Sequence, residues 1–440
     1  MNKVCFKLTY VVLGITMILS SCGNKLTILG EDSSNLQALE TLKSTYERES
    51  GLEISFRPNT FEDTWEKANQ DFVNKTGLYD IVMEYNFSLS SYVRNQYIWN
   101  IADLMEMADV KDISFEKDLF QNAWKEVGFY YKNPLDPENG QLQKVGYPFA
   151  TNTMILVYNK RMFEKQENKQ NYRKKYGEEL DVPRTWKQYR QIAEFFTTDK
   201  TFGVCMQGAV GSWLYYEYCD FLYGMGASVF DKKYGWEGDK DTKITICSKE
   251  AEDATKLYLS MKKFNKGPFF TVDATEQVKL IQEGDVAMGL VWSDYLYSFI
   301  SSNKSSRFGY APIPGDKSPI AGGCFYVNKE TKHPQESIRY ILHIMKPETQ
   351  VILTLKGLCS PFRSIYKNAE VQKTIPYAQA LSESLERGTY MFEAGLESTR
   401  VSDIITNHIQ RLWRGDNTDV KSILQQITID IESARKEIYR

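Results

Sequence analysis

The feature that most restricts the fold is an alternation of short apolar runs with amphipathic helical patterns early in the chain. Residues 26–29 and 52–56 are strand-like, and the segment 34–50 between them carries leucines at helical spacing. A second helical pattern begins at about Phe61, and the apolar run 79–83 follows it. Because parallel strands require a crossover element between them, this order predicts an α/β fold with a largely parallel sheet.

The rest of the chain continues the alternation. Residues 151–158 are typical of a strand, whereas residues 164–181 are charged and polar and predict a surface excursion without an apolar period. Thr185 and Gln188 have the spacing of a capping box, which predicts a helix that begins near Trp186. Further helices are predicted over 213–223, 249–264, 274–283, 404–413 and after Thr418, and further strands over 285–291, 308–314 and 324–327.

The N-terminal segment has the layout of a bacterial lipoprotein signal. Two lysines precede an apolar run at residues 8–19 that is too short to span a bilayer, and the sequence Leu-Ser-Ser-Cys ends at Cys22. This ending resembles a lipobox, which implies removal of residues 1–21 as a signal peptide and acylation of Cys22. An ordinary secretory signal is the alternative. We therefore expect an exported protein that is anchored by lipid to a bacterial membrane, in the periplasm or at the cell surface.

Charge and the supply of metal-binding side chains exclude several classes of protein. The formal net charge of −3 includes no basic excess, so nucleic acid is not an expected partner. Of the seven cysteines, five follow Cys22 without a metal or redox spacing, and the three histidines are scattered, so neither a metal nor a cofactor is expected. Common hydrolase, metalloprotease and phosphate-loop motifs do not occur in the sequence. We expect no catalytic residues, although the paired carboxylates of a glycoside hydrolase remain an alternative.

A series of short motifs, in a fixed order along the chain, resembles one protein family. The motifs are Tyr-Asp-Ile-Val at 79–82, Gly-Tyr-Pro-Phe at 146–149, Tyr-Asn-Lys at 158–160, Pro-x-Thr-Trp at 183–186, Gly-Asp-Val-Ala-Met at 284–288, Ala-Pro-Ile-Pro-Gly at 311–315 and Ser-Pro-x-Arg at 360–363. Together they resemble the extracellular solute-binding proteins of ABC importers, the family that includes maltose-binding protein. The resemblance covers nearly all of the chain after the signal.

The resemblance implies a two-lobe periplasmic-binding-protein fold of type II, in which crossing strands join two α/β lobes that close like a hinge. One expected lobe comprises residues 26–149 and 327–380, and the other comprises residues 153–321 and 392–440 with the C-terminal helices. The chain is expected to cross between the lobes near residues 149–153, 321–326 and 380–392.

The resemblance also implies candidate ligand-binding residues in the cleft between the lobes, where strands end. The candidates are Glu84, Tyr85, Asn86, Thr151, Asn152, Trp213, Tyr215, Trp292, Asp294, Gly322 and Gly323. Family members often carry a tryptophan at the position of Asp294, whereas here the tryptophan stands two positions earlier, at Trp292. Each aromatic candidate could instead pack in the core, but the place of Trp292 at a strand end favours ligand contact.

These residue types suit a sugar. The apolar C–H face of a pyranose stacks on tryptophan or tyrosine, its hydroxyls need fixed acids and amides, and glycine lets the backbone approach. We expect a protein that captures a mono- or oligosaccharide and delivers it to the membrane subunits of an ABC importer. A ligand-sensing subunit, which would have the same fold, and a glycan-capture lipoprotein are alternatives. Peptides, polyamines and polyols are alternative ligands.

Overall fold

The computed structural model describes residues 25–438, apart from 112, 133–140, 210, 232–241, 303–304, 316, 392–397 and 417–418. The expected signal peptide, the expected lipidation site Cys22 and the expected helix cap Thr418 lie outside the described residues.

The N-terminal part forms the parallel β-α-β arrangement that the sequence predicts. Its elements are β1 (Lys25–Glu31), α1 (Ser34–Glu40), α2 (Lys43–Ser50), β2 (Glu53–Asn59), α3 (Phe61–Asn74) and β3 (Ile81–Tyr85). β1 pairs in parallel with both β2 and β3. The sequence predicts one helix over 34–50, and the structure has two. The Thr41 hydroxyl donates to the Ala38 carbonyl, and the Thr41 and Leu42 amides bond three residues back, which tightens and ends the first helix.

The next part of the chain again alternates helices with strands. Its elements are α7 (Lys160–Glu164), α8 (Gln166–Tyr176), α9 (Trp186–Phe196), β7 (Phe202–Val204), α10 (Trp213–Gly224), α11 (Lys249–Ser260), α12 (Ala274–Glu283), β8 (Val286–Trp292), α13 (Tyr297–Ile300) and β9 (Phe308–Pro312). The predicted capping box is confirmed, because the Thr185 hydroxyl accepts from the Gln188 amide and the Gln188 side chain accepts from the Thr185 amide. Residues 164–181, predicted as a surface excursion without an apolar period, include the helix α8. Tyr172 is the one buried side chain of this helix.

Long strands cross between the two halves. They are β6 (Tyr147–Asn159) and β10 (Ser318–Val327), with the short β11 (Gly388–Tyr390) paired to the start of β10. β10 is antiparallel to β3 and β6, and β6 is antiparallel to β8 and β9. The strand order is β2-β1-β3-β10-β6-β8-β7. The prediction of a largely parallel sheet is therefore wrong: each crossing strand enters a lobe from the other one and runs against that lobe's own strands.

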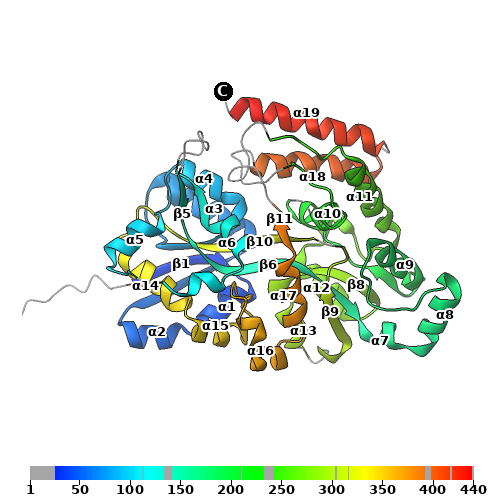
Figure 1. Cartoon of the computed structure of the whole chain (residues 1–440), viewed down its shortest axis with the longest axis horizontal. Helices are drawn as coiled ribbons and strands as arrows, with labels where there is room; N and C mark the ends of the chain where they lie inside the picture. The colour runs from blue at the N-terminus through cyan, green and yellow to red at the C-terminus, as the bar shows by residue number, and fades with distance from the viewer. Residues whose placement is uncertain are drawn as a thin grey trace, which may run out of the picture.

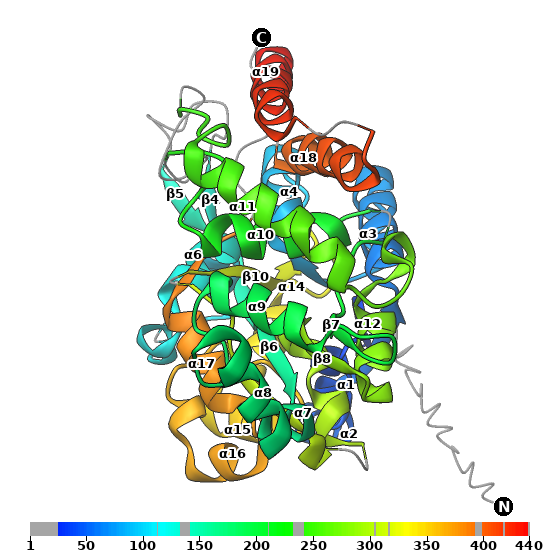
Figure 2. The same ribbon diagram turned by 90° about the vertical axis from the view of Figure 1, so that its right-hand side faces the viewer.

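The remaining elements complete the fold. They are α4 (Leu89–Arg94), α5 (Ile101–Met107), α6 (Gln121–Gly128), β4 (Phe129–Tyr131), β5 (Leu142–Lys144), α14 (Pro334–Ile344), α15 (Pro347–Thr354), α16 (Ala369–Thr374), α17 (Ala378–Glu386), α18 (Ser398–Arg414) and α19 (Val420–Ile438). Figure 1 shows two lobes side by side, with α1–α5, α14 and α15 in one, α7–α13 in the other, and β6 and β10 between them. Both Figure 1 and Figure 2 place α18 and α19 over α10 and α11, against which they pack.

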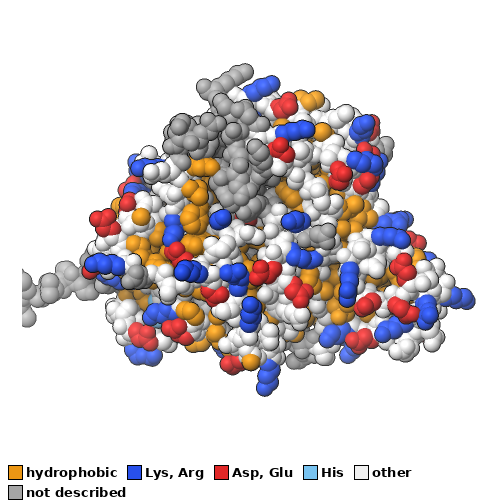
Figure 3. All heavy atoms as spheres, in the orientation of Figure 1, with side chains coloured by type: hydrophobic (Ala, Val, Ile, Leu, Met, Phe, Trp, Pro, Cys, Tyr) orange, Lys and Arg blue, Asp and Glu red, His pale blue; other side chains and the backbone are white. Residues whose placement is uncertain are grey.

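On the face drawn in Figure 3, Lys and Arg side chains are interspersed with Asp and Glu. Within the described ranges, no helix has both the length and the apolar character that crossing a membrane requires.

Candidate functional site

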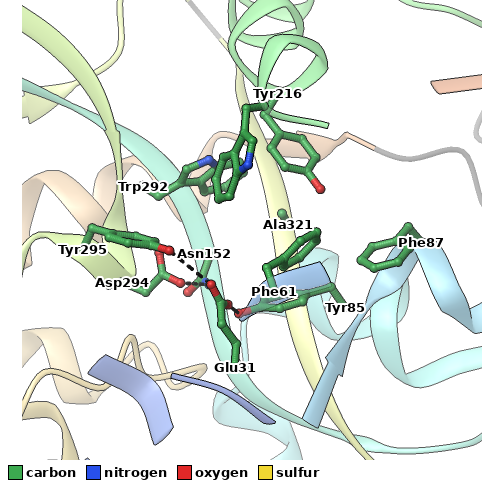
Figure 4. Close-up of a pocket in the computed structure, with 11 residues that line it drawn as sticks. Glu31, Phe61, Tyr85, Phe87, Asn152, Tyr216, Trp292, Asp294, Tyr295 and Ala321 are labelled. Carbon is green, nitrogen blue, oxygen red and sulfur yellow. Dashed lines mark hydrogen bonds between the residues drawn. The ribbon is translucent and has the colours of Figure 1, made fainter. Parts of the chain in front are cut away.

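A pocket lies between the two lobes, where β3 and β8 end beside the crossing strands. The lining residues are Glu31, Phe61, Tyr85, Phe87, Asn152, Trp213, Tyr216, Trp292, Asp294, Tyr295 and Ala321. Figure 4 shows Trp292 and Tyr216 on one side of the pocket and the carboxylates of Glu31 and Asp294 on another. Both lobes and both crossing strands contribute side chains.

Aromatic rings from both lobes form most of the wall. The ring of Phe61, at the start of α3, lies 6.0 Å from that of Trp213 and 5.5 Å from that of Phe87. Tyr216 on α10 meets Trp292 edge to face, with ring centroids 5.4 Å apart. Phe61 therefore closes the space between the lobes by touching α10. These rings offer apolar faces on which a flat or ring-shaped solute can stack.

Two buried carboxylates form the polar part of the pocket. Glu31, at the end of β1, accepts hydrogen bonds from the Tyr85 hydroxyl at 2.5 Å and the Tyr295 hydroxyl at 3.1 Å. Asp294 Oδ2 accepts from Asn152 Nδ2 at 3.0 Å. Burial raises the pKa of the Glu31 carboxyl, and burial together with the nearby Glu31 raises the pKa of Asp294 well above its usual value. The two acids therefore favour their neutral forms more than exposed acids do.

Two polar atoms in the lining have no hydrogen-bond partner among the described residues. They are Asp294 Oδ1, an acceptor, and Trp292 Nε1, a donor. Buried polar atoms in folded proteins are nearly always paired, with protein, water or ligand. An unpaired acceptor and an unpaired donor facing one pocket are consistent with a polar ligand that satisfies both.

The backbone around Asp294 is held from the other lobe. The Ser34 hydroxyl at the start of α1 donates to the Asp294 carbonyl at 2.6 Å and to the Gly357 carbonyl at 2.8 Å. Together with the Tyr295–Glu31 hydrogen bond, this contact joins the lobes across the pocket. The arrangement observed here is thus one in which the lobes are in contact around the site.

The structure brings five of the eleven sequence-predicted residues together in this pocket: Tyr85, Asn152, Trp213, Trp292 and Asp294. Trp292 and Asp294 both line the pocket, whereas the sequence left open which of the two faces the ligand. The other candidates have neighbours of their own outside the lining.

The acid and amide that flank Tyr85 point into the first lobe. Glu84 accepts hydrogen bonds from the Ser88 hydroxyl and the Tyr85 amide, and burial raises its pKa to about 8. Asn86 donates to Glu126 at 2.7 Å. Successive side chains of a strand point to opposite faces, so Glu84 and Tyr85 cannot both face the pocket.

The remaining candidates also pack elsewhere. The Thr151 hydroxyl donates to the Ser360 carbonyl at 3.1 Å, and the Tyr215 hydroxyl donates to the Met391 carbonyl at 3.0 Å. At Gly322 and Gly323, the space that a Cβ would need is taken by Val127 and by the Phe149 ring. These glycines therefore permit close packing of the crossing strand against protein side chains.

Six lining residues were not among the sequence candidates: Glu31, Phe61, Phe87, Tyr216, Tyr295 and Ala321. Glu31 follows an apolar strand, as Glu84 does, so the same signal could have found it. Tyr216 is adjacent to the candidate Tyr215, but α10 is buried on nearly every side, and its sequence therefore does not indicate which ring faces the pocket. Within the described ranges, no group of three or more His, Cys, Asp or Glu could hold a metal ion.

The fold and the pocket define a two-lobed binding protein whose site lies between the lobes. The chain belongs to the bacterial extracellular solute-binding protein family, whose sequence model matches residues 41–378. This confirms the resemblance seen in the motifs and assigns the chain to a family of binding proteins rather than enzymes. No curated protein matches the sequence.

Solved structures share the fold at low sequence identity. An ABC transporter solute-binding protein from Agrobacterium radiobacter, in complex with ribitol, is 18% identical, with a TM-score of 0.75 over 93% of this chain and 98% of that one. Maltose-bound T. maritima MalE3 is 17% identical, with a TM-score of 0.75 over 93% and 99%. A solute-binding protein from Thermotoga lettingae, bound with α-D-tagatose, is 17% identical, with a TM-score of 0.76 over 94% and 100%. These similarities confirm the two-lobe periplasmic-binding-protein fold.

Proposed function

We propose that this protein captures a small carbohydrate in the pocket between its lobes and delivers it to the membrane subunits of an ABC importer. The observation that carries the proposal is the combination of aromatic walls with buried acid and amide groups in one pocket. Rings such as Trp292 and Tyr216 suit the C–H face of a sugar, and Asp294 and Asn152 suit its hydroxyls. Solved structures of similar fold are bound to ribitol, maltose or α-D-tagatose, and two of the three are described as ABC transporter solute-binding proteins, which supports the same assignment.

The expected solute is a mono- or oligosaccharide, because the pocket offers ring faces for stacking together with acid and amide groups for hydroxyls. We assign Tyr85, Asn152, Trp213, Trp292 and Asp294 to ligand contact, and the residues with other neighbours, such as Glu84 and Thr151, to support of the site.

Closure of the two lobes would trap the solute. In this proposal residues 26–149 with 327–380 move as one lobe and residues 153–321 with 392–440 as the other. The contacts of Phe61 with Trp213 and of Tyr295 with Glu31 would then exist in the closed form alone. A ligand can drive closure only through contacts that differ between the two forms, and a pocket lined from both lobes meets this condition.

The mature protein would be tethered to the membrane through a lipid on Cys22. The basic start, the short apolar run and the Leu-Ser-Ser-Cys ending support this part of the proposal. Mass spectrometry of the protein extracted from membranes should show a mature chain that begins at Cys22 with added acyl mass. If a Cys22→Ser variant stays membrane-bound and its mass differs from that of the original protein only by the substitution, the lipid anchor is refuted.

The function is tested by a thermal-shift screen on protein without residues 1–22, with sugars, polyols, amino acids and peptides as the panel. A specific ligand at a hundredfold excess over its Kd stabilises the native state by about 2.7 kcal/mol, so a sugar should raise the unfolding temperature. Calorimetry should then give one site per chain, and chromatography should recover the sugar unchanged. A shift caused by another solute class and by no sugar, or turnover of the sugar, would contradict the proposal.

A further inference from the structure

The charge composition of the pocket differs from that of the rest of the molecule. The chain has 54 Lys and Arg against 57 Asp and Glu, and both signs are interspersed over the face in Figure 3. The described residues that line the pocket include two carboxylates, Glu31 and Asp294, and no Lys, Arg or His. The charged groups that act on Glu31 from nearby are Glu62 and Asp32, and on Asp294 the group is Glu31. Each of these neighbours is an acid.

The two carboxylates are therefore buried without a positive partner. Burying an ionised carboxylate is costly unless it is paired with a cation and hydrogen-bonded. Glu31 has hydrogen bonds from two tyrosines but no cation, and Asp294 has one from Asn152 and an unpartnered Oδ1. Burial raises the pKa of both acids, and nearby acids add to the effect.

The aromatic wall of the pocket also suits a positively charged ligand. Trp292, Tyr216 and Phe61 lie around the space above the carboxylates (Figure 4). The negative face of an aromatic ring attracts a cation, and tryptophan does so most strongly. Trp292 also has an unpartnered Nε1–H, which requires an acceptor such as a hydroxyl or ether oxygen.

We propose that the ligand carries a protonated amine that binds at Asp294 and Glu31, and hydroxyl or ether oxygens that accept from Trp292. This chemistry defines an amino sugar or amino polyol. The inference rests on the proposed function, because it takes the pocket as the solute site and a carbohydrate as the solute. It adds the charge of the ligand, which neither the family nor the fold specifies.

Matched ligands test the inference on the unmodified mature chain. Calorimetry would compare glucosamine with glucose and N-acetylglucosamine, galactosamine with galactose, and glucamine with sorbitol, and would include glucuronate. The amine should bind at least about tenfold more tightly than its neutral or acetylated partner, as expected for hydrogen bonds to a charged group. Glucuronate should bind more weakly than glucose, because its carboxylate would meet two acids.

A pair of variants identifies the residue responsible. Asp294→Asn should remove most of the preference for the amine while changing the affinity for the neutral partner much less. Asp220→Asn is the matched control, because Asp220 is also fully buried in the second lobe but does not line the pocket. It should leave the preference unchanged. If Asp294→Asn retains the preference, or if Asp220→Asn removes it, the assignment to Asp294 is wrong.

The ligand comparison separates this inference from the proposed function. Neutral sugars that bind as tightly as their amines, or more tightly, would overturn the inference and leave the proposed function standing. Failure of all neutral and amino carbohydrates to bind, while another class of solute does, would overturn both. Because this comparison needs no variant, poor folding of Asp294→Asn would not prevent a decision.

Discussion

Truncation of Trp292 should weaken ligand binding through loss of a stacking surface. Trp292 ends β8, lines the pocket and meets Tyr216 edge to face at 5.4 Å. Loss of an aromatic that anchors a ligand costs about 1–3 kcal/mol, which corresponds to an increase in Kd of about 5- to 150-fold. Trp292→Ala should therefore raise the Kd of the solute by an amount in this range.

The same substitution should also destabilise the fold. Trp292 is 5% exposed, and replacing a buried tryptophan by alanine costs about 3–5 kcal/mol, because the lost side chain leaves a cavity. Here the cavity would join the pocket and could fill with water, so we expect the lower end of that range. Urea unfolding measures this loss, and calorimetry must be done at a temperature at which the variant is folded.

Trp186 provides a matched control. It is also 5% exposed, its Nε1 also has no hydrogen-bond partner among the described residues, and its ring lies 4.3 Å from Phe221. Trp186 does not line the pocket. Trp186→Ala should therefore lose a similar free energy of unfolding while its Kd stays at the wild-type value. An unchanged Kd in Trp292→Ala, or equal increases in Kd in both variants, would refute the reasoning and assign Trp292 to the core.

Two further predictions concern pH and lobe motion. Burial raises the pKa of Asp220 well above its usual value, and neither of its carboxylate oxygens has a partner among the described residues. The stability that the neutral carboxyl provides is therefore fully present below pH about 4 and is lost as the pH rises through the raised pKa. The free energy of unfolding should fall by up to about 1.4 kcal/mol per pH unit over that interval. Asp220→Asn should therefore gain stability over wild type between pH 4.5 and 7.5 in urea unfolding, and a difference independent of pH would contradict this. Small-angle scattering should give a smaller radius of gyration with saturating solute than without it. Without solute the lobes would open and break contacts such as Phe61–Trp213. Equal radii would show a rigid or permanently closed protein.

Local sequence patterns were sufficient for much of the fold. The β-α-β opening, the capping box at Thr185 and the helix over 274–283, which ends before Gly284 with its φ of 95°, depend on residues close in sequence, so the sequence predicted them correctly. The order of the short motifs likewise indicated the family that the comparison assigns. Among the site residues, strand ends and aromatic runs indicated the right neighbourhoods, and five candidates lie in the pocket.

Orientation within those neighbourhoods depended on tertiary structure. An apolar period shows which side of an element faces inward only when the other side meets water. β3 and β10 are buried at every position, and α10 at nearly every one, so their sequences do not distinguish Tyr85 from Glu84 or Tyr216 from Tyr215. Glu31 and Asp294, 263 positions apart in the sequence, meet only because β6 and β10 bring the lobes together. Short-range sequence patterns therefore determine where the helices and strands form. The contacts that build the pocket are long-range and depend on the assembled fold.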